Sequence, residues 1–254
     1  MRGCADFLTN GGFDMHTGIT LQNILLDRLG HTGTAASVVL VLLTLFCIAV
    51  PYLLGSVNFA LVISKVFYHD DIRKYGSGNA GMTNMLRTYG KGAAAATLLC
   101  DMLKSVVSVL LGSFLLGTAF GGYLAGMFCV IGHIFPIFFR FKGGKGVATV
   151  AAMILTLDPL CFLILAVIFL LLVAATRYVS LGSVICMMLY PIITYKLATH
   201  GSIGFPVLFS FIVAALIIFM HRGNIERLRN HTENRISFSK KDKKAKKDTG
   251  GKRK

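Results

Sequence analysis

The sequence predicts an all-α integral membrane protein with seven transmembrane helices and polar loops gathered on the cytoplasmic face. Mean hydropathy is +0.70. Of the 254 residues 55% are apolar and 15% are charged, far below the roughly 25% charged residues of a soluble domain. Apolar runs close to the about 20 residues that a bilayer requires recur along the chain. Composition and the spacing of these runs therefore both indicate a polytopic membrane fold.

The first predicted span covers residues 32–64, which carry no charge. Pro51, Gly55 and Asn58 fall in its second half, so we expect a bent helix whose inner end is marked by Lys65. Further spans are expected at 93–112, 117–139, 160–176, 181–197 and 205–220. A shorter apolar run at 146–157 makes the seventh, and an odd number of crossings places the two termini on opposite sides.

Positive charge is distributed unevenly between the two sets of loops. One set holds Arg73, Lys74, Arg87, Lys91, Arg140, Lys142, Lys145, Arg177, Arg222, Arg227 and Arg229, and the other holds Asp158, Lys196 and His200. The positive-inside rule makes the first set cytoplasmic. We therefore predict a multi-pass protein of the cytoplasmic (inner) membrane with its N-terminus outside and its C-terminus cytoplasmic. Without a crossing at 146–157 the bias would be lost, which favours seven spans.

The chain divides into four predicted segments. An N-terminal extension (1–35) has no assigned role, a seven-helix membrane domain (36–222) carries the active-site loops, and a juxtamembrane cytoplasmic segment (223–238) precedes a basic disordered tail (239–254). Much of the formal net charge of +15 lies in the tail, which indicates attraction to anionic lipid headgroups rather than a nucleic-acid partner. Five of the six cysteines lie singly in apolar runs, so they predict neither disulfides nor a metal site.

The first polar cluster, residues 73–84, contains the spacing Gly-x-Gly-x-x-Gly. No predicted strand precedes it, so a dinucleotide-binding fold is rejected. The glycines allow backbone N–H groups to converge on an anion, and the candidate phosphate ligands are Arg73, Ser77, Asn79 and Asn84. A glycine-rich turn flanked by ordinary cytoplasmic charge explains this segment alone equally well.

The second cluster, residues 132–149, contains a histidine and a glycine turn that leads into an apolar helix. A helix N-terminus with free amides binds anions, and lysines add compact positive charge. The candidate ligands are Lys142, Gly143, Gly144, Lys145 and Thr149. The frame of a Walker A loop is absent, which disfavours nucleotide hydrolysis. The alternative is that the lysines only anchor the chain at the membrane interface.

The third cluster follows the last span, where His221 and Asn224 share one face of a continuing helix. The alternative interpretation is an amphipathic juxtamembrane helix whose arginines meet lipid headgroups. Inside the second span Asp101 and Lys104 stand three residues apart, and we expect them to pair because an unpaired charge in a bilayer is costly. The pair is either the floor of a pocket that opens inward or a structural ion pair. We expect Glu233 likewise to have a structural role or to lie on the pocket floor.

Together these residues resemble the membrane-bound acyl-phosphate:glycerol-3-phosphate acyltransferases of bacteria over residues 52–236. The resemblance rests on blocks in the family's order: Gly55-Ser56, then Gly76-Ser77-Gly78-Asn79 with Gly81, Thr83-Asn84 and Arg87, then Gly132-His133 with Phe135-Pro136 and residues 141–149, then His221 with Asn224 and Arg227-Leu228. The chain departs from the family's pattern at Asn58, Tyr75 and His231, where proline, histidine and glycine are frequent.

The resemblance implies a cofactor-independent enzyme that moves a fatty acyl group from acyl phosphate to the 1-hydroxyl of sn-glycerol 3-phosphate. The products are lysophosphatidic acid and phosphate, at the first step of phospholipid synthesis. We expect catalytic roles for His133, His221 and Asn224. Substrate binding is expected from Ser56, Arg73, Ser77, Asn79, Asn84, Lys142, Gly143, Gly144, Lys145 and Thr149. A histidine or a substrate phosphate accepts the hydroxyl proton, and we expect residues 135–139 to line a slot for the acyl tail.

Two other classes fit parts of the sequence. Acyl-CoA-dependent glycerol phosphate acyltransferases typically carry His-x4-Asp, and no histidine here has an aspartate five positions on. A membrane transporter of phosphate or a phosphate ester is the second alternative, because its cytoplasmic gate would also be rich in glycine and lysine. Such a transporter binds its substrate near the bilayer midplane, where only Asp101 and Lys104 come close.

Overall fold

The computed structural model describes residues 20–29, 33–197 and 204–236. The predicted basic tail at 239–254 and most of the predicted extension at 1–35 lie outside these residues. In the described parts of the chain every regular element is a helix. The prediction of an all-α fold is therefore confirmed for them.

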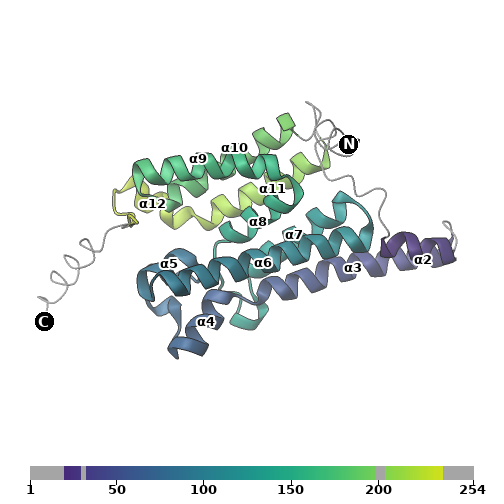
Figure 1. The fold of residues 1–254 in the computed structure, drawn as a ribbon, viewed down its shortest axis with the longest axis horizontal. Coiled ribbons are helices and arrows are strands. Elements are labelled where there is room, and N and C mark those ends of the chain that lie inside the picture. The colour runs from purple at the N-terminus through teal and green to yellow at the C-terminus, as the bar shows by residue number, and fades with distance from the viewer. Residues whose placement is uncertain (1–19, 30–32, 198–203, 237–254) are drawn as a thin grey trace, which may run out of the picture.

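The helices, in chain order, are α2 (Leu21–Leu29), α3 (Thr34–Ser56), α4 (Phe59–Tyr68), α5 (Met82–Thr88), α6 (Lys91–Leu116), α7 (Ala119–Ile134), α8 (Val147–Leu157), α9 (Pro159–Thr176), α10 (Val179–Leu197), α11 (Phe205–Met220) and α12 (Arg222–Arg229). Two short 3₁₀ turns, η2 (Ile72–Lys74) and η3 (Ile137–Phe139), lie in the loops. Figure 1 shows two groups of helices on either side of α8. In the first group α3, α6 and α7 pack on one another, in the second α10 packs on α9 and α11, and α8 contacts α6, α7 and α9.

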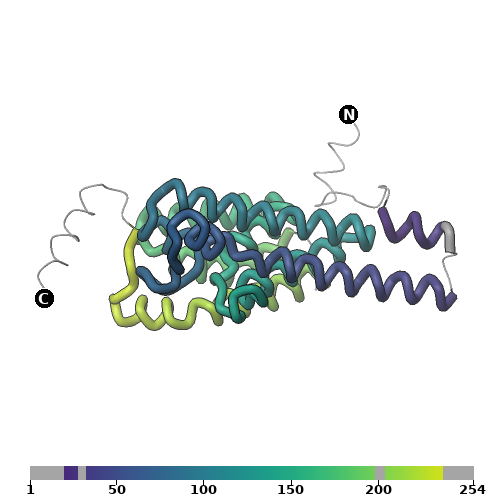
Figure 2. The backbone as a smooth tube through the Cα atoms, turned by 90° about the horizontal axis from the view of Figure 1, so that it is seen from below, coloured from purple at the N-terminus to yellow at the C-terminus, as the bar shows by residue number. Residues whose placement is uncertain are grey.

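Helices α4, α5 and α12 lie together at one end of the elongated molecule, opposite α2 (Figures 1 and 2). We call this the site end. The polar loops that precede α5 and follow α11 lie here. Sequence segments far apart in the chain are thus brought to the same end by the alternating direction of the helices.

The predicted break in the first span lies between α3 and α4. Helix α3 ends at Ser56, and the Asn58 side chain begins α4 by accepting a hydrogen bond from the Leu61 amide at 3.1 Å, as an N-cap does. The same side chain donates to the Ala80 carbonyl at 3.3 Å. Asn58 therefore starts the second helix and ties the break to the first polar loop.

Glycines bring α3 and α7 into backbone contact. A Cβ added to Gly55 would lie 2.1 Å from the Cys129 carbonyl oxygen, and one added to Gly132 would lie 2.2 Å from the Tyr52 carbonyl oxygen. Small residues allow such close crossings between membrane helices. Because His133 follows Gly132, this crossing holds His133 against the end of α3.

Five stretches of the described chain are long and apolar enough to cross a bilayer, namely Thr34–Tyr68, Lys91–Leu116, Ala119–Phe139, Pro159–Thr176 and Val179–Leu197. Helices α11 and α12 make a sixth if they are counted as one span bent by 58°. Helix α8 occupies the place of the short predicted span and has 11 residues. It is therefore only about 16 Å long, against the about 30 Å of a bilayer core.

Helix α8 is short because the loop before it folds back along the end of α7. The Gly143 amide donates to the Ile134 carbonyl at 3.1 Å, and α8 begins beside Ile134. Its last residue, Leu157, lies against Gly122 near the start of α7. The loop and α8 together therefore carry the chain from the site end back to the opposite end.

The helix α2 lies in the N-terminal extension, to which the sequence assigned no role. It packs on α3 and α6. Thr20, just before it, fills the space over Gly117, whose φ of +62° favours glycine. Leu21 and Leu25 pack against the apolar cluster around Leu43. This part of the extension therefore belongs to the packed fold, at the end of the molecule opposite the site.

Candidate active site

All three polar clusters meet in one cavity of about 390 Å³. The first cluster contributes Ser77, Asn79 and Asn84, the second His133 and Lys145, and the third His221, Asn224 and Glu233. Arg87 of α5, just after the first cluster, also lines the cavity. Asp101 of α6 also lies on the cavity wall. Amide, hydroxyl, imidazole and cationic groups from distant parts of the sequence thus face one space.

From this polar part the cavity continues into an apolar passage between the two helix groups. The passage is lined by Leu98, Met102, Ala151, Ile154, Phe162, Leu165, Phe169, Leu170, Cys186 and Met187, which come from α6, α8, α9 and α10. The expectation that residues 135–139 line such a slot is wrong. None of them lines the cavity, and Phe135 and Phe138 are exposed on the outside. Their turn lies against the end of α3, where the Ile137 amide donates to the Ser56 hydroxyl at 3.3 Å.

The Asn84 side chain organises the first polar loop. Its nitrogen donates to the carbonyls of Ile72, Tyr75 and Asn79 at 3.1, 2.9 and 3.0 Å. Its oxygen accepts the Ser77 amide at 3.1 Å. Since these bonds use the donors and an acceptor of the amide, Asn84 shapes the loop, and the expected contact with a substrate phosphate has no free donor to make it.

A chain of polar contacts crosses the cavity from the second cluster to the third. Lys145 Nζ donates to the Asn224 side-chain oxygen, Asn224 Nδ2 donates to Glu233 at 2.9 Å, and Glu233 pairs with Arg227 at 2.8 Å. Burial lowers the pKa of Lys145 to about 8, against an opposing effect of the Glu233 carboxylate. Lys145 is therefore a half-buried cation that faces the cavity and carries its charge below about pH 8.

His221 presents a proton-free ring nitrogen. Its Nδ1 lies 2.8 Å from the Ile217 carbonyl oxygen, and because a carbonyl only accepts, Nδ1 carries the proton in the neutral ring. Burial lowers the pKa of His221 to about 4, and the charge of Lys145 acts in the same direction. At neutral pH the lone pair therefore sits on Nε2, where it can accept a hydrogen bond from a hydroxyl in the cavity.

The predicted pairing of Asp101 with Lys104 is confirmed, with 2.7 Å between Nζ and Oδ1. Lys104 Nζ also donates to the Val57 and Gly55 carbonyls at 2.7 and 3.0 Å, and it lies 3.1 Å from His133 Nδ1. Helix ends leave carbonyls without helical partners, and Lys104 satisfies two of them at the end of α3. Asp101 and His133 line the cavity whereas Lys104 lies behind them. The pair therefore forms part of the pocket surface through Asp101 and is also a structural ion pair.

The glycine turn of the second cluster packs on His133, and its amides are not free to bind an anion. The Gly143 and Gly144 amides donate to the Ile134 and His133 carbonyls at 3.1 Å each. A Cβ on Gly143 would lie 2.1 Å from the His133 carbonyl oxygen, and one on Gly144 would lie 2.2 Å from His133 Nε2. Glycine is required for this close approach, and the expectation that these amides hold a phosphate finds no support in this geometry.

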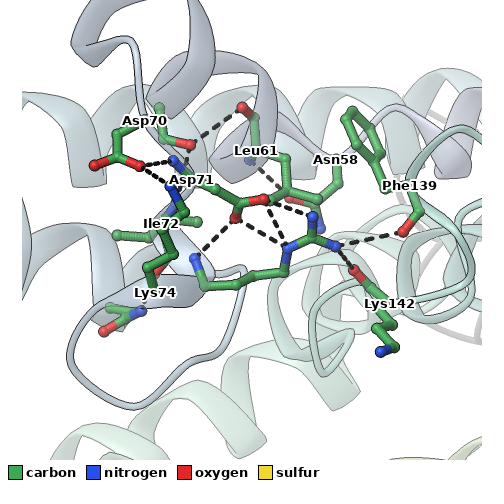
Figure 3. A network of polar contacts seen from close by, with 11 residues as sticks. Asn58, Leu61, Asp70, Asp71, Ile72, Lys74, Phe139 and Lys142 are labelled. Carbon is green, nitrogen blue, oxygen red and sulfur yellow. Dashed lines mark hydrogen bonds and ion pairs between the residues drawn. The ribbon is translucent and has the colours of Figure 1, made fainter.

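Arg73 joins the first and second loops but does not line the cavity. Its guanidinium pairs with Asp71 at 2.6 Å and donates to the carbonyls of Phe139 and Lys142 at 3.4 and 3.0 Å. Figure 3 shows Asp71 and these two carbonyls around the same network, with the Lys142 ammonium directed away from it. The expected substrate contacts of Arg73 and Lys142 therefore find no support in this geometry.

Ser56 and Thr149 are likewise buried outside the cavity lining. Ser56 accepts the Ile137 amide, as described above. The Thr149 carbonyl accepts the Ser105 hydroxyl at 2.7 Å, while the Thr149 hydroxyl has no partner among the described residues. Both residues form part of the walls.

Two serines that sequence reasoning missed line the cavity from the first turns of α10. Ser183 donates to the Val179 carbonyl at 2.9 Å. The Ser180 hydroxyl is buried and has no partner in the described part of the chain. The signal was present: two serines three residues apart share one face at the start of an apolar helix.

The fold and the cavity define a class of protein. It is a multi-pass helical membrane protein whose polar, cationic pocket leads into an apolar passage, which suits a phosphorylated lipid. Among the described residues no three His, Cys, Asp or Glu side chains gather as metal ligands. The model of the family described as glycerol-3-phosphate acyltransferase matches residues 45–231. The chain belongs to this family.

Curated relatives extend this match over most of their own length. A glycerol-3-phosphate acyltransferase of Streptococcus thermophilus is 42% identical over 201 residues, which cover 76% of this chain and 93% of the relative. One from Thermoanaerobacter pseudethanolicus is 41% identical over 187 residues, covering 74% and 92%. Glycerol-3-phosphate acyltransferase 3 of Bacillus anthracis is 42% identical over 194 residues, covering 76% and 96%.

Solved structures of an integral membrane glycerol 3-phosphate acyltransferase, PlsY, share the fold. Its glycerol 3-phosphate form superposes with a TM-score of 0.71 at 34% identity, covering 76% of this chain and 96% of that one. Its lysophosphatidic acid form gives a TM-score of 0.68 at 33% identity, covering 76% and 95%.

Proposed function

We propose that the protein transfers a fatty acyl group from acyl phosphate to the 1-hydroxyl of sn-glycerol 3-phosphate, which yields lysophosphatidic acid and phosphate. The observation that carries the proposal is the single cavity in which a cationic pocket leads into an apolar passage. A phosphate and an acyl chain find complementary surroundings there. The family match and the glycerol 3-phosphate and lysophosphatidic acid forms of the solved relative support the same substrates.

Lys145 holds the phosphate of glycerol 3-phosphate. It is the cation of the second cluster that faces the cavity, and Asn224 and Glu233 fix its position. Ser77 and Asn79 of the first cluster and Arg87 of α5 line the cavity, so they receive the headgroup of acyl phosphate. Ser56, Arg73, Asn84, Lys142, Gly143, Gly144 and Thr149 shape the walls that present these groups.

The acyl chain occupies the passage between α6, α8, α9 and α10. Its wall is apolar, and each methylene buried there contributes about 0.8 kcal/mol relative to water. Ser180 lies at the site end of this passage with an unpartnered hydroxyl. That hydroxyl is placed to donate to the acyl-phosphate oxygens.

Acyl phosphate is a mixed anhydride, so its carbonyl is already activated. The protein has to align the hydroxyl with this carbonyl and neutralise the charge of the two phosphates. The hydroxyl oxygen attacks the carbonyl carbon, a new C–O ester bond forms, and the bond from carbon to the phosphate oxygen breaks. Alignment and electrostatic stabilisation dominate such a step. The positive groups around the cavity offset the repulsion between the two phosphates.

The hydroxyl proton passes to a substrate phosphate. The pKa of His221 is lowered to about 4, whereas a phosphate monoester has its second pKa near about 6, so the phosphate is the stronger base. His221 Nε2 then orients glycerol 3-phosphate by accepting a hydrogen bond from the hydroxyl that does not react. A His221→Ala enzyme should retain a near-normal pH–rate profile while its KM for glycerol 3-phosphate rises, and loss of the pH dependence in that variant would assign the proton transfer to His221.

The chain crosses the cytoplasmic membrane seven times, with the short helix α8 as one crossing. Its polar loops and C-terminus are then cytoplasmic and its N-terminus is outside, and membrane lipid surrounds the apolar faces. The positive-inside distribution supports this orientation. Reporter fusions after residue 236 and in the α7–α8 loop should both report a cytoplasmic location, and opposite locations would contradict seven crossings.

The donor decides between acyl-phosphate chemistry and its alternatives. Purified protein in lipid vesicles should form lysophosphatidic acid from palmitoyl phosphate and labelled glycerol 3-phosphate, and none from palmitoyl-CoA. Product from palmitoyl-CoA alone would contradict the proposed donor. Movement of label across the vesicle membrane without product would indicate a transporter.

A further inference from the structure

The last described residues, 232–236, run from the end of α12 across the site end. They form an extended strap, seen in yellow beyond α12 in Figure 1. The family match ends at residue 231, before the strap begins. Glu233 and Asn234 nevertheless line the substrate cavity.

On its inner side the strap reaches the phosphate-binding groups. The Thr232 amide donates to the Arg227 carbonyl at 2.8 Å, which turns the chain back toward the cavity. The Glu233 side chain, 5% exposed, then receives hydrogen bonds from Asn224 and Arg227. Because Asn224 accepts from Lys145, the position of the strap is transmitted to Lys145.

On its outer side the strap is attached to both helix groups. Arg235 Nε donates to the Tyr178 hydroxyl at 3.0 Å, and its guanidinium lies 5.1 Å from the centre of the Tyr178 ring. The Ile236 amide donates to the Arg177 carbonyl at 2.8 Å. Arg87 of α5 donates to the Asn234 carbonyl at 3.4 Å. The strap therefore bridges the α9–α10 turn and α5, on opposite sides of the cavity.

We propose that Tyr178 and Arg235 are positioning residues that dock the strap and so hold Glu233, Asn224 and Lys145 in place for the phosphate of glycerol 3-phosphate. Neither side chain is among those that line the cavity, so each acts through the strap. The proposal rests on the proposed function for the identity of this ligand. The two substrates should respond differently, because the strap reaches Lys145 through the side chains of Glu233 and Asn224, whereas it meets Arg87 through one 3.4 Å contact of the Asn234 carbonyl.

Equilibrium binding of labelled glycerol 3-phosphate and steady-state kinetics test this. Arg235→Ala and Tyr178→Ala should each raise the Kd and KM for glycerol 3-phosphate roughly three- to tenfold, as expected for an exposed cation–π contact with one hydrogen bond. The KM for palmitoyl phosphate and kcat should stay within about twofold. Tyr178→Phe keeps the ring and loses the hydroxyl, so its Kd for glycerol 3-phosphate should lie between those of the wild type and Tyr178→Ala. The double alanine variant should be no worse than the worse single one, because both remove one contact.

Arg229→Ala is the matched control, since Arg229 is an exposed residue of α12 whose side chain makes no hydrogen bond, ion pair or cation–π contact with the described residues. It should leave the Kd unchanged. An equal loss in Arg229→Ala would show that only bulk charge matters, and unchanged or additive Kd values in the strap variants would also overturn the proposal. If the wild type formed no lysophosphatidic acid, the proposed function would fail, while the Kd comparison would still decide the role of the strap.

Discussion

At the residue scale, the cavity separates cations that face the substrate from cations that build the protein. Lys145 lines the cavity, whereas the ammonium of Lys104 is bonded to Asp101 and to backbone carbonyls behind the wall. Arg73 is likewise engaged with Asp71 and the second loop. These roles cannot be read from residue type, because all three side chains carry the same charge.

The pH dependence of glycerol 3-phosphate use should report Lys145. Only its protonated form attracts a phosphate, so kcat/KM should fall as pH rises through about 8, the pKa of this ammonium in the free protein. Lys145→Arg stays charged at all working pH values, so its profile should lose this limb. Initial rates at low glycerol 3-phosphate between roughly pH 6 and pH 10 measure the effect. If kcat/KM of Lys145→Arg still fell near pH 8, the pH dependence would belong to another titrating group.

Removal of Lys104 separates stability from positioning. Lys104→Met leaves the buried Asp101 carboxylate unpaired and should cost roughly 3–5 kcal/mol, seen as a large fall in the unfolding temperature in detergent. Asp101→Asn with Lys104→Met removes both charges and should recover much of that stability. Activity should stay low in the double variant, because the α3 carbonyls and His133 have lost the ammonium. Full activity in the double variant would show that Lys104 contributes only its ion pair with Asp101 and does not position the active site.

At the element scale, close contact between α3 and α7 positions the wall of the site. The crossing at Gly55 and Gly132 places His133 beside Lys104 and beside the glycine turn that precedes α8. The break after α3 places Asn58 against the first loop. Small residues at this helix crossing and the capping side chain of Asn58 thus fix the positions of His133, of the first polar loop and of the glycine turn before α8.

Gly55→Ala should therefore impair both folding and activity. The new methyl group would lie 2.1 Å from the Cys129 carbonyl oxygen, and such overpacking typically costs roughly 1–3 kcal/mol. Gly92→Ala on α6 is the matched control, because a Cβ there meets nothing within 4 Å, and it should be neutral or stabilising by up to about 1 kcal/mol. Unfolding temperatures in detergent compare the two. Equal behaviour of both variants would argue against a tight crossing.

Sequence reasoning succeeded where a pattern has one physical meaning. Long apolar runs predicted the long helices, and Pro51, Gly55 and Asn58 predicted the bend in the first span, although α3 continues through Pro51 and ends only at Ser56. It failed where one residue type serves two purposes. The glycines at 143 and 144 could bind an anion through their amides or allow close packing, and only the fold shows those amides bonded to the end of α7. Ser180 was missed although Ser183 lies on the same helix face, because serines are common in apolar membrane helices and two of them do not by themselves predict a site.

At the scale of the whole molecule, the cavity exists because two groups of helices meet along α8. The first group supplies Asp101, His133 and the first polar loop, and the second supplies His221, Asn224 and most of the apolar passage. Neither group contains a complete site. This arrangement places the phosphate groups at the site end and directs the acyl chain between the groups, toward the interior of the bundle.

The most direct test of this account is the rate of lysophosphatidic acid formation from palmitoyl phosphate and labelled glycerol 3-phosphate, without CoA, by the wild type and by Lys145→Ala in matched lipid vesicles. The shared cavity predicts product from the wild type and a loss of about a hundredfold or more in Lys145→Ala, the size expected when a group that stabilises reacting charge is removed. No product from the wild type, or equal rates for the two proteins, would contradict it.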